Sequence, residues 1–101
     1  MGQYSEEVSD HDIQIKRLAA ELTQLVEFVP VTKAELNLWY DQAQRLHESD
    51  LLLGVPHFLW HYLSDADIRM KDEVYAEMQN QRVIDLLAYL NRGIMPSDND
   101  V

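Results

Sequence analysis

Cysteine is absent from the 101 residues of this chain. Its absence excludes disulfides, thiolate metal sites and cysteine nucleophiles. Glycine and proline are scarce, with three residues of each, and neither a glycine-rich phosphate loop nor the G-x-S-x-G motif of serine hydrolases occurs. We therefore expect one compact domain without long linkers and without catalytic activity of its own.

Positive charge is also scarce. The chain has eight Lys and Arg against eighteen Asp and Glu, a formal net charge of −10. Because Lys and Arg supply most of the affinity for phosphates, we expect no binding to nucleic acid and none to anionic membrane surfaces. A protein that mimics DNA would need rows of surface carboxylates in place of phosphates. Here the acidic residues alternate with Lys and Arg, which argues against that function. The charge favours a protein partner with a basic surface, because opposite charge speeds association.

Long hydrophobic runs are missing as well. The thirteen residues Leu51–Leu63 contain no Asp, Glu, Lys or Arg, but a membrane-spanning helix needs about 20 apolar residues. This stretch is therefore predicted to form the centre of the core. The first residues are acidic and include no apolar run, which predicts the absence of a signal peptide and a cytoplasmic location.

Apolar residues recur at helical spacing in the first third of the chain. Those from Ile15 to Val29 fall on one side of a predicted helix. Ser9 or Asp10 can cap its start, and Pro30 ends it.

A second helix is predicted to begin after Thr32. The sequence T-x-x-E, Thr32 to Glu35, matches a capping box, and an apolar face continues to about Glu48. The connection around Pro30 and Val31 has only two or three residues. Helices joined by so short a link are typically antiparallel neighbours.

The second half of the chain predicts a short helix followed by a long one. Pro56 suits a first helical position, and residues 57–63 are apolar around the whole circumference, as in a helix surrounded by others. Ser64 offers a new N-cap, which predicts a bend. A long helix is then expected over Asp65–Arg92, closed by Gly93.

Together these patterns predict an all-α fold, a compact bundle of three to four helices with a long C-terminal helix. A single helical domain is expected over residues 9–94. Disordered segments are expected at residues 1–8 and 95–101.

The long helix carries two features that require partners. Asp72 falls on its apolar side, so either the helix departs locally from the pattern or the carboxylate meets a partner such as Arg45 or a histidine. The second half of the helix is apolar almost all round, which predicts a contact with a second copy or another protein. This predicted interaction surface comprises Val83, Ile84, Leu87, Tyr89 and Leu90.

The spacing of the histidines suggests an alternative function, the binding of a metal ion. His57 and His61 are four residues apart, which places both rings on one helical face, as metal sites on helices require. His47 is the candidate third ligand. Glu48, Asp50 and Asp65 are further candidates for that position. The H-E-x-x-H pattern of zinc proteases is absent, and histidines bonded at a helix junction explain the spacing equally.

Two functions are therefore in competition. The first is a small acidic protein-interaction module, acting as an adaptor, inhibitor or regulatory subunit, with homodimerisation possible. The second is a helical protein that binds a metal or a small ligand near the three histidines. Aromatic residues at helical spacing could line a haem pocket, but such spacing is typical of core packing and no haem attachment motif occurs. We expect no cofactor.

Overall fold

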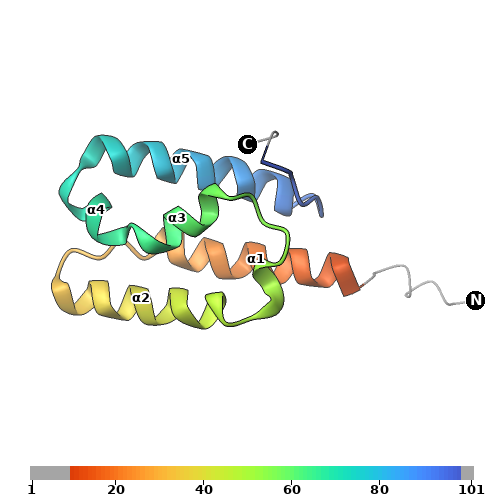
Figure 1. Ribbon diagram of the computed structural model, residues 1–101, viewed down its shortest axis with the longest axis horizontal. Coiled ribbons are helices and arrows are strands. Elements are labelled where there is room, and N and C mark those ends of the chain that lie inside the picture. Colours follow the sequence, from red (N-terminus) through yellow and green to blue (C-terminus); the bar gives the residue numbers. More distant parts are fainter. Residues whose placement is uncertain (1–9, 99–101) are drawn as a thin grey trace, which may run out of the picture.

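The computed structural model describes residues 10–98, with side chains from Asp12 onward. Within this range it contains five α-helices, one short 3₁₀ helix and no strand (Figure 1). These are α1 Asp10–Glu27, α2 Lys33–His47, η2 Asp50–Leu52, α3 Phe58–Ser64, α4 Ala66–Lys71 and α5 Glu73–Leu90. The predicted all-α class is confirmed. None of the described helices is long and apolar enough to cross a membrane.

Helix α1 follows its predicted apolar face. Ile15, Leu18, Leu22 and Leu25 are all nearly inaccessible to solvent. Val29 departs from the prediction, because the helix ends at Glu27 and leaves this side chain 70% exposed in the following connection.

The start of α2 confirms the capping box. The backbone N–H of Glu35 donates to the Thr32 hydroxyl at 3.1 Å, and the Glu35 carboxylate accepts from the N–H of Val31 at 2.8 Å. The α1–α2 link is further fixed by Trp39, whose indole N–H donates to the carbonyl of Leu25 at 3.0 Å. That carbonyl lies in the last turn of α1, where the helix itself provides no donor.

The helices surround one core. In Figure 1, α2 runs along the lower edge antiparallel to α1, and α5 runs along the upper edge. Helix α1 packs against both of them, and so do α3 and α4 together. Most of Leu51–Leu63 is buried between these elements, as predicted, although Leu53 is 76% exposed.

The predicted long C-terminal helix is broken at Asp72. This residue has an extended backbone, with φ −136° and ψ 102°, and separates α4 from α5. Its exposed carboxylate accepts a hydrogen bond from the N–H of Tyr75 at 3.0 Å. Asp72 therefore caps α5, and among the described residues its carboxylate bonds no buried group. A carboxylate is favoured at this position because it satisfies one of the free N–H groups at the start of a helix.

The end of α5 follows the prediction at Gly93. This glycine has φ 79°, and the N–H of Ile94 donates to the carbonyl of Tyr89 at 3.0 Å. Glycine is favoured here because other residues rarely adopt a positive φ.

The packed domain extends beyond residue 94. Met95 packs against the core, Pro96 is buried, and the Asp98 carboxylate accepts a hydrogen bond from the backbone N–H of His57. Residues 95–98 are therefore part of the domain, which corrects the predicted disordered tail. The predicted disordered segment 1–8 and residues 99–101 lie outside the described residues.

Candidate functional site: a groove between α2 and α3

A groove of about 430 Å³ lies between α2 and the end of α3. Ligand sites in proteins typically occupy about 300–1,000 Å³, so this volume suits a ligand or a segment of a partner. We call it the α2–α3 groove. It is lined by Tyr40, Ala43, Gln44, His47, Leu63 and Ser64.

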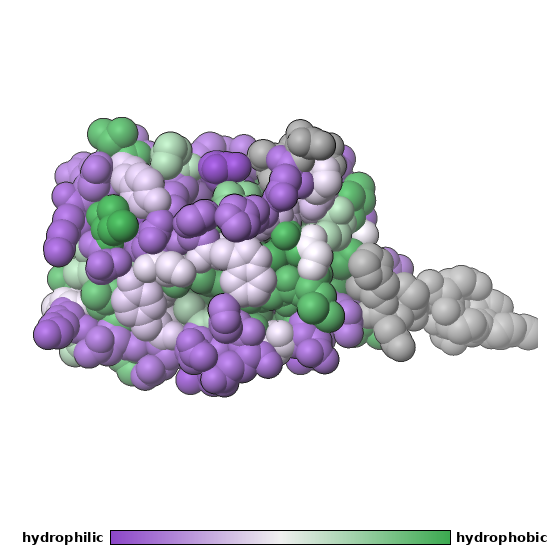
Figure 2. Space-filling model, in the orientation of Figure 1, coloured by the Kyte–Doolittle hydropathy of each residue, from purple (hydrophilic) through white to green (hydrophobic). Residues whose placement is uncertain are grey.

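The spacing along α2 explains how the groove forms. The four α2 residues recur at intervals of three and four, which places them on one helical face. Ala43 is buried and small, so it leaves room where a larger residue would fill the space; Leu63 of α3 is also buried. In Figure 2 a band of apolar and weakly polar residues crosses the middle of this face, with hydrophilic residues above and below it.

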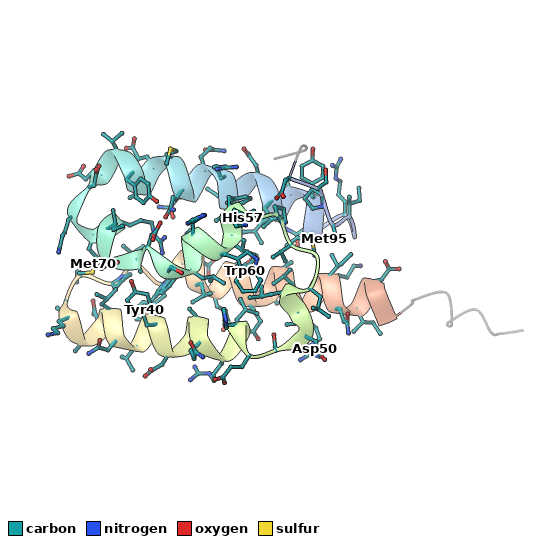
Figure 3. All side chains as sticks on the ribbon, viewed as in Figure 1. Tyr40, Asp50, His57, Trp60, Met70 and Met95 are labelled. Atoms are coloured by element: carbon teal, nitrogen blue, oxygen red, sulfur yellow. The ribbon has the colours of Figure 1, made fainter. Side chains whose placement is uncertain are left out.

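Aromatic side chains stand beside the groove. The rings of His47 and Trp60 meet edge to face, with centroids 5.0 Å apart. Tyr40 of α2 and Trp60 of α3 both lie on this face of the molecule (Figure 3). Tyr and Trp are enriched at binding surfaces because they combine a large apolar area with a polar group.

One end of the groove carries a fixed negative charge. The Tyr40 hydroxyl donates to the Asp67 carboxylate at 2.9 Å, and the N–H of Asp67 donates back to the hydroxyl at 3.2 Å. The hydrogen bond from Tyr40 lowers the pKa of Asp67. Burial raises the pKa of Tyr40, which keeps its hydroxyl protonated as the donor. Asp67 therefore stays ionised at neutral pH.

The opposite end is also acidic. The side-chain amide of Gln44 donates to the Glu48 carboxylate at 3.0 Å. An aromatic groove between two carboxylates suits a cationic group, which both the carboxylates and the aromatic faces attract.

The structure separates the predicted metal ligands. The rings of His57 and His61 lie close together, with centroids 5.1 Å apart, but His47 packs against Trp60 instead. Among the side chains described, no three His, Asp or Glu residues are close enough to hold a metal ion. Catalytic zinc sites use three protein ligands, and this pair supplies two.

Two of the other candidate ligands are engaged elsewhere. Asp65 accepts a hydrogen bond from the Tyr75 hydroxyl at 2.6 Å. Glu48 accepts from Gln44 at the groove. Asp50 begins η2, on the stretch that links α2 to α3.

The predicted interaction surface on α5 is mostly interior. Val83 and Leu90 are fully buried, and Leu87 packs partly buried against the core. Tyr89 is half-buried, and Ile84 is 49% exposed. The apolar circumference of this segment is explained by α1 and α3, which both pack against α5. Of these five side chains, Ile84 is therefore the most accessible to solvent.

Sequence patterns missed a polar cluster between α4 and α5. Gln79 links the Arg69 guanidinium to the Asp65 carboxylate. Arg69 Nη1 donates to Gln79 Oε1 at 2.6 Å, and Gln79 Nε2 donates to Asp65 Oδ2 at 3.2 Å. A glutamine within an otherwise apolar helical stripe is the signal that could have identified this cluster.

Comparison with known proteins assigns no family or function to this chain. The chain matches no protein family model, no curated protein and no solved structure. A functional conclusion therefore depends on the shape, residues and charge of the sites themselves.

Proposed function

We propose that this protein is a non-catalytic interaction module that binds a basic, partly apolar segment of another protein in the α2–α3 groove. The observation that carries the proposal is the groove itself, with Tyr40 and Trp60 beside it and ionised Asp67 at one end. Such a module could act as a cytoplasmic adaptor, inhibitor or regulatory subunit.

The charge of the chain supports a basic partner. A net charge of −10 attracts cationic surfaces over distances near the Debye length of about 8–10 Å. At contact, Lys or Arg side chains would meet Asp67 and the aromatic faces, while apolar side chains would cover Ala43 and Leu63. Aromatic side chains in such positions often supply most of the binding energy.

The groove chemistry supports binding over catalysis. Tyr40 is held by Asp67, and its raised pKa makes the hydroxyl a poor nucleophile at neutral pH. His47 has its ring against Trp60. Neither residue is paired with the other in the nucleophile and base arrangement that covalent catalysis requires.

The first test is a titration with a synthetic peptide of alternating Arg and Leu, amidated so that it carries no carboxylate. The two tryptophan indole N–H groups, Trp39 and Trp60, give separate NMR signals. We expect a saturable shift of the Trp60 signal while Trp39, buried in the core, is little changed. A peptide that leaves the Trp60 signal unmoved at low salt would overturn the proposal.

A further inference from the structure

A second, smaller cavity lies at the end of the molecule where the α1–α2 connection meets α4 and the beginning of α5. Its volume is about 70 Å³, and its wall includes Phe28, Val29, Met70 and the rings of Trp39 and Tyr62. Figure 3 shows Met70 beside the connection. Arg69 is the charged residue among the described residues that line it. We call this the Arg69 cavity.

The guanidinium of Arg69 is held in one position. Its carbon Cζ lies 3.9 Å from the centroid of the Tyr62 ring and 5.0 Å from that of Trp39. Nη1 donates to the carbonyl of Tyr62 at 2.7 Å and to Gln79 Oε1 at 2.6 Å, which uses both of its hydrogens. A cation fixed in this way is preorganised for a ligand.

Three N–H groups of this guanidinium remain available. They belong to Nη2 and Nε, which donate to no oxygen of the described residues, and a guanidinium carries five N–H donors in all. No fully buried side-chain nitrogen in the described part of the chain lacks a partner, so solvent reaches these two atoms. Arg69 is one of the residues that line the Arg69 cavity, so the cavity is an opening beside this guanidinium.

No carboxylate of the described residues is bonded directly to Arg69. Asp65 is the neighbouring acid, and its Oδ2 accepts from the Tyr75 hydroxyl at 2.6 Å and from Gln79 at 3.2 Å. Burial lowers the pKa of Arg69, although arginine stays protonated at neutral pH. A partly desolvated guanidinium with unused N–H groups favours binding of an anion. Hydrogen bonds between charged groups are about twice as strong as those between neutral groups.

We propose that the Arg69 cavity binds a carboxylate on a short apolar stem. The carboxylate would accept from Nη2 and Nε of Arg69, and the stem would contact Phe28, Val29 and Met70. The cavity exceeds the roughly 10–15 Å³ that one water needs but is far below the size of a drug-like site. A free acid of a few carbons and the C-terminal residue of a peptide both present this chemistry. The site is independent of the α2–α3 groove.

The test compares sodium butyrate with butyramide, which has the same shape without the charge. Trp39 lines the cavity and its indole N–H bonds the carbonyl of Leu25, another lining residue, whereas Trp60 lies at the α2–α3 groove, so the two NMR signals report on different sites. We expect a saturable shift of the Trp39 signal alone, with butyrate bound about tenfold more tightly than butyramide. Equal binding of both compounds, no shift, or a linear change of both signals would each overturn the proposal.

Matched variants avoid disturbing the Arg69 network. Val29 lines the cavity and is 70% exposed, whereas Val31, on the same connection, is 74% exposed and does not line it. Val29→Phe should fill the cavity and weaken butyrate binding about tenfold, while Val31→Phe should leave it unchanged. Equal effects of the two variants would contradict the site.

A further experiment distinguishes a free small acid from the C-terminus of a peptide. It measures binding of a short peptide ending in valine, once as the free acid and once as the C-terminal amide. Tighter binding of the peptide acid than of butyrate, lost in the amide, identifies a chain terminus. Binding of butyrate without binding of the peptide acid identifies a free small acid.

Discussion

Single polar residues decide where the helices of this protein begin and end. Thr32 and Gly93 act as the sequence predicts, because capping depends on a few neighbouring atoms. Asp72 acts against the pattern around it, since its carboxylate bonds the N–H of Tyr75 and starts a new helix. At this scale, local chemistry outweighs helical periodicity.

The cap at Asp72 gives a direct prediction. Asp72→Ala removes the acceptor and should lower the free energy of unfolding by about 1 kcal/mol. Asp72→Asn keeps an acceptor at the same place and should retain most of the stability. Urea unfolding of the three proteins measures the difference. Equal losses in the two variants would show that the cap is not the source of the effect.

Tyr62 gives a prediction for alkaline pH. Burial raises its pKa above the ordinary value of 10.0. Above pH 10, the folded protein therefore binds this proton more tightly than the unfolded chain does, so stability present at neutral pH is lost as pH rises through the raised pKa.

Replacing Tyr62 by phenylalanine should remove this loss of stability at alkaline pH. Tyr62→Phe should change stability little near pH 7, because no described group bonds the hydroxyl, and should reduce the fall in melting temperature as pH rises above about 10. Thermal unfolding at several pH values checks this. An unchanged alkaline fall in the variant would contradict the account.

Among the elements, the sequence predicted those that depend on local signals. The buried face of α1, the start of α2 and the end of α5 followed from apolar spacing, a capping box and a glycine. The role of the second half of α5 did not follow, because an apolar circumference shows that a helix is covered without showing what covers it. In the structure, Val83 and Leu90 are covered by the protein's own core and not by a partner.

The candidate sites were less predictable than the helices. Tyr40 and Trp60 are twenty residues apart in the chain, and only the packing of α3 on α2 brings them to one face. The Arg69 cavity likewise joins the α1–α2 connection to α4 and α5. Side chains collected from distant segments leave no spacing signal in a single sequence.

The turn after α5 gives a prediction at the scale of elements. Gly93→Ala should lower the free energy of unfolding by about 1 kcal/mol, because alanine is strained at φ 79°. A new Cβ would lie 3.8 Å from an Asp12 oxygen, an ordinary contact, so backbone strain is the expected cause. Gly93→Asn should cost less, since asparagine tolerates this conformation. Denaturant titration of both variants should show that order; the reverse order would contradict it.

Across the whole molecule, two proposed sites have opposite charge preferences. The α2–α3 groove is acidic and aromatic and suits a basic segment, whereas the Arg69 cavity presents a cation to a carboxylate. Association at the groove should slow as salt is added, because salt screens the attraction of a chain with net charge −10. Stopped-flow mixing with the amidated Arg and Leu peptide measures this rate; a rate independent of salt would contradict electrostatic attraction.

The most direct test of the central claim, that the α2–α3 groove binds a basic segment, compares two substitutions of equal charge. Gln44 lines the groove, whereas Gln81 is exposed on α5 and bonds Asp85 there. Isothermal titration with the amidated peptide should show binding weakened about fivefold by Gln44→Lys, on the scale of about 1 kcal/mol for exposed charges, and little changed by Gln81→Lys. Equal weakening by both would show that net charge alone attracts the peptide and would contradict a groove-specific site.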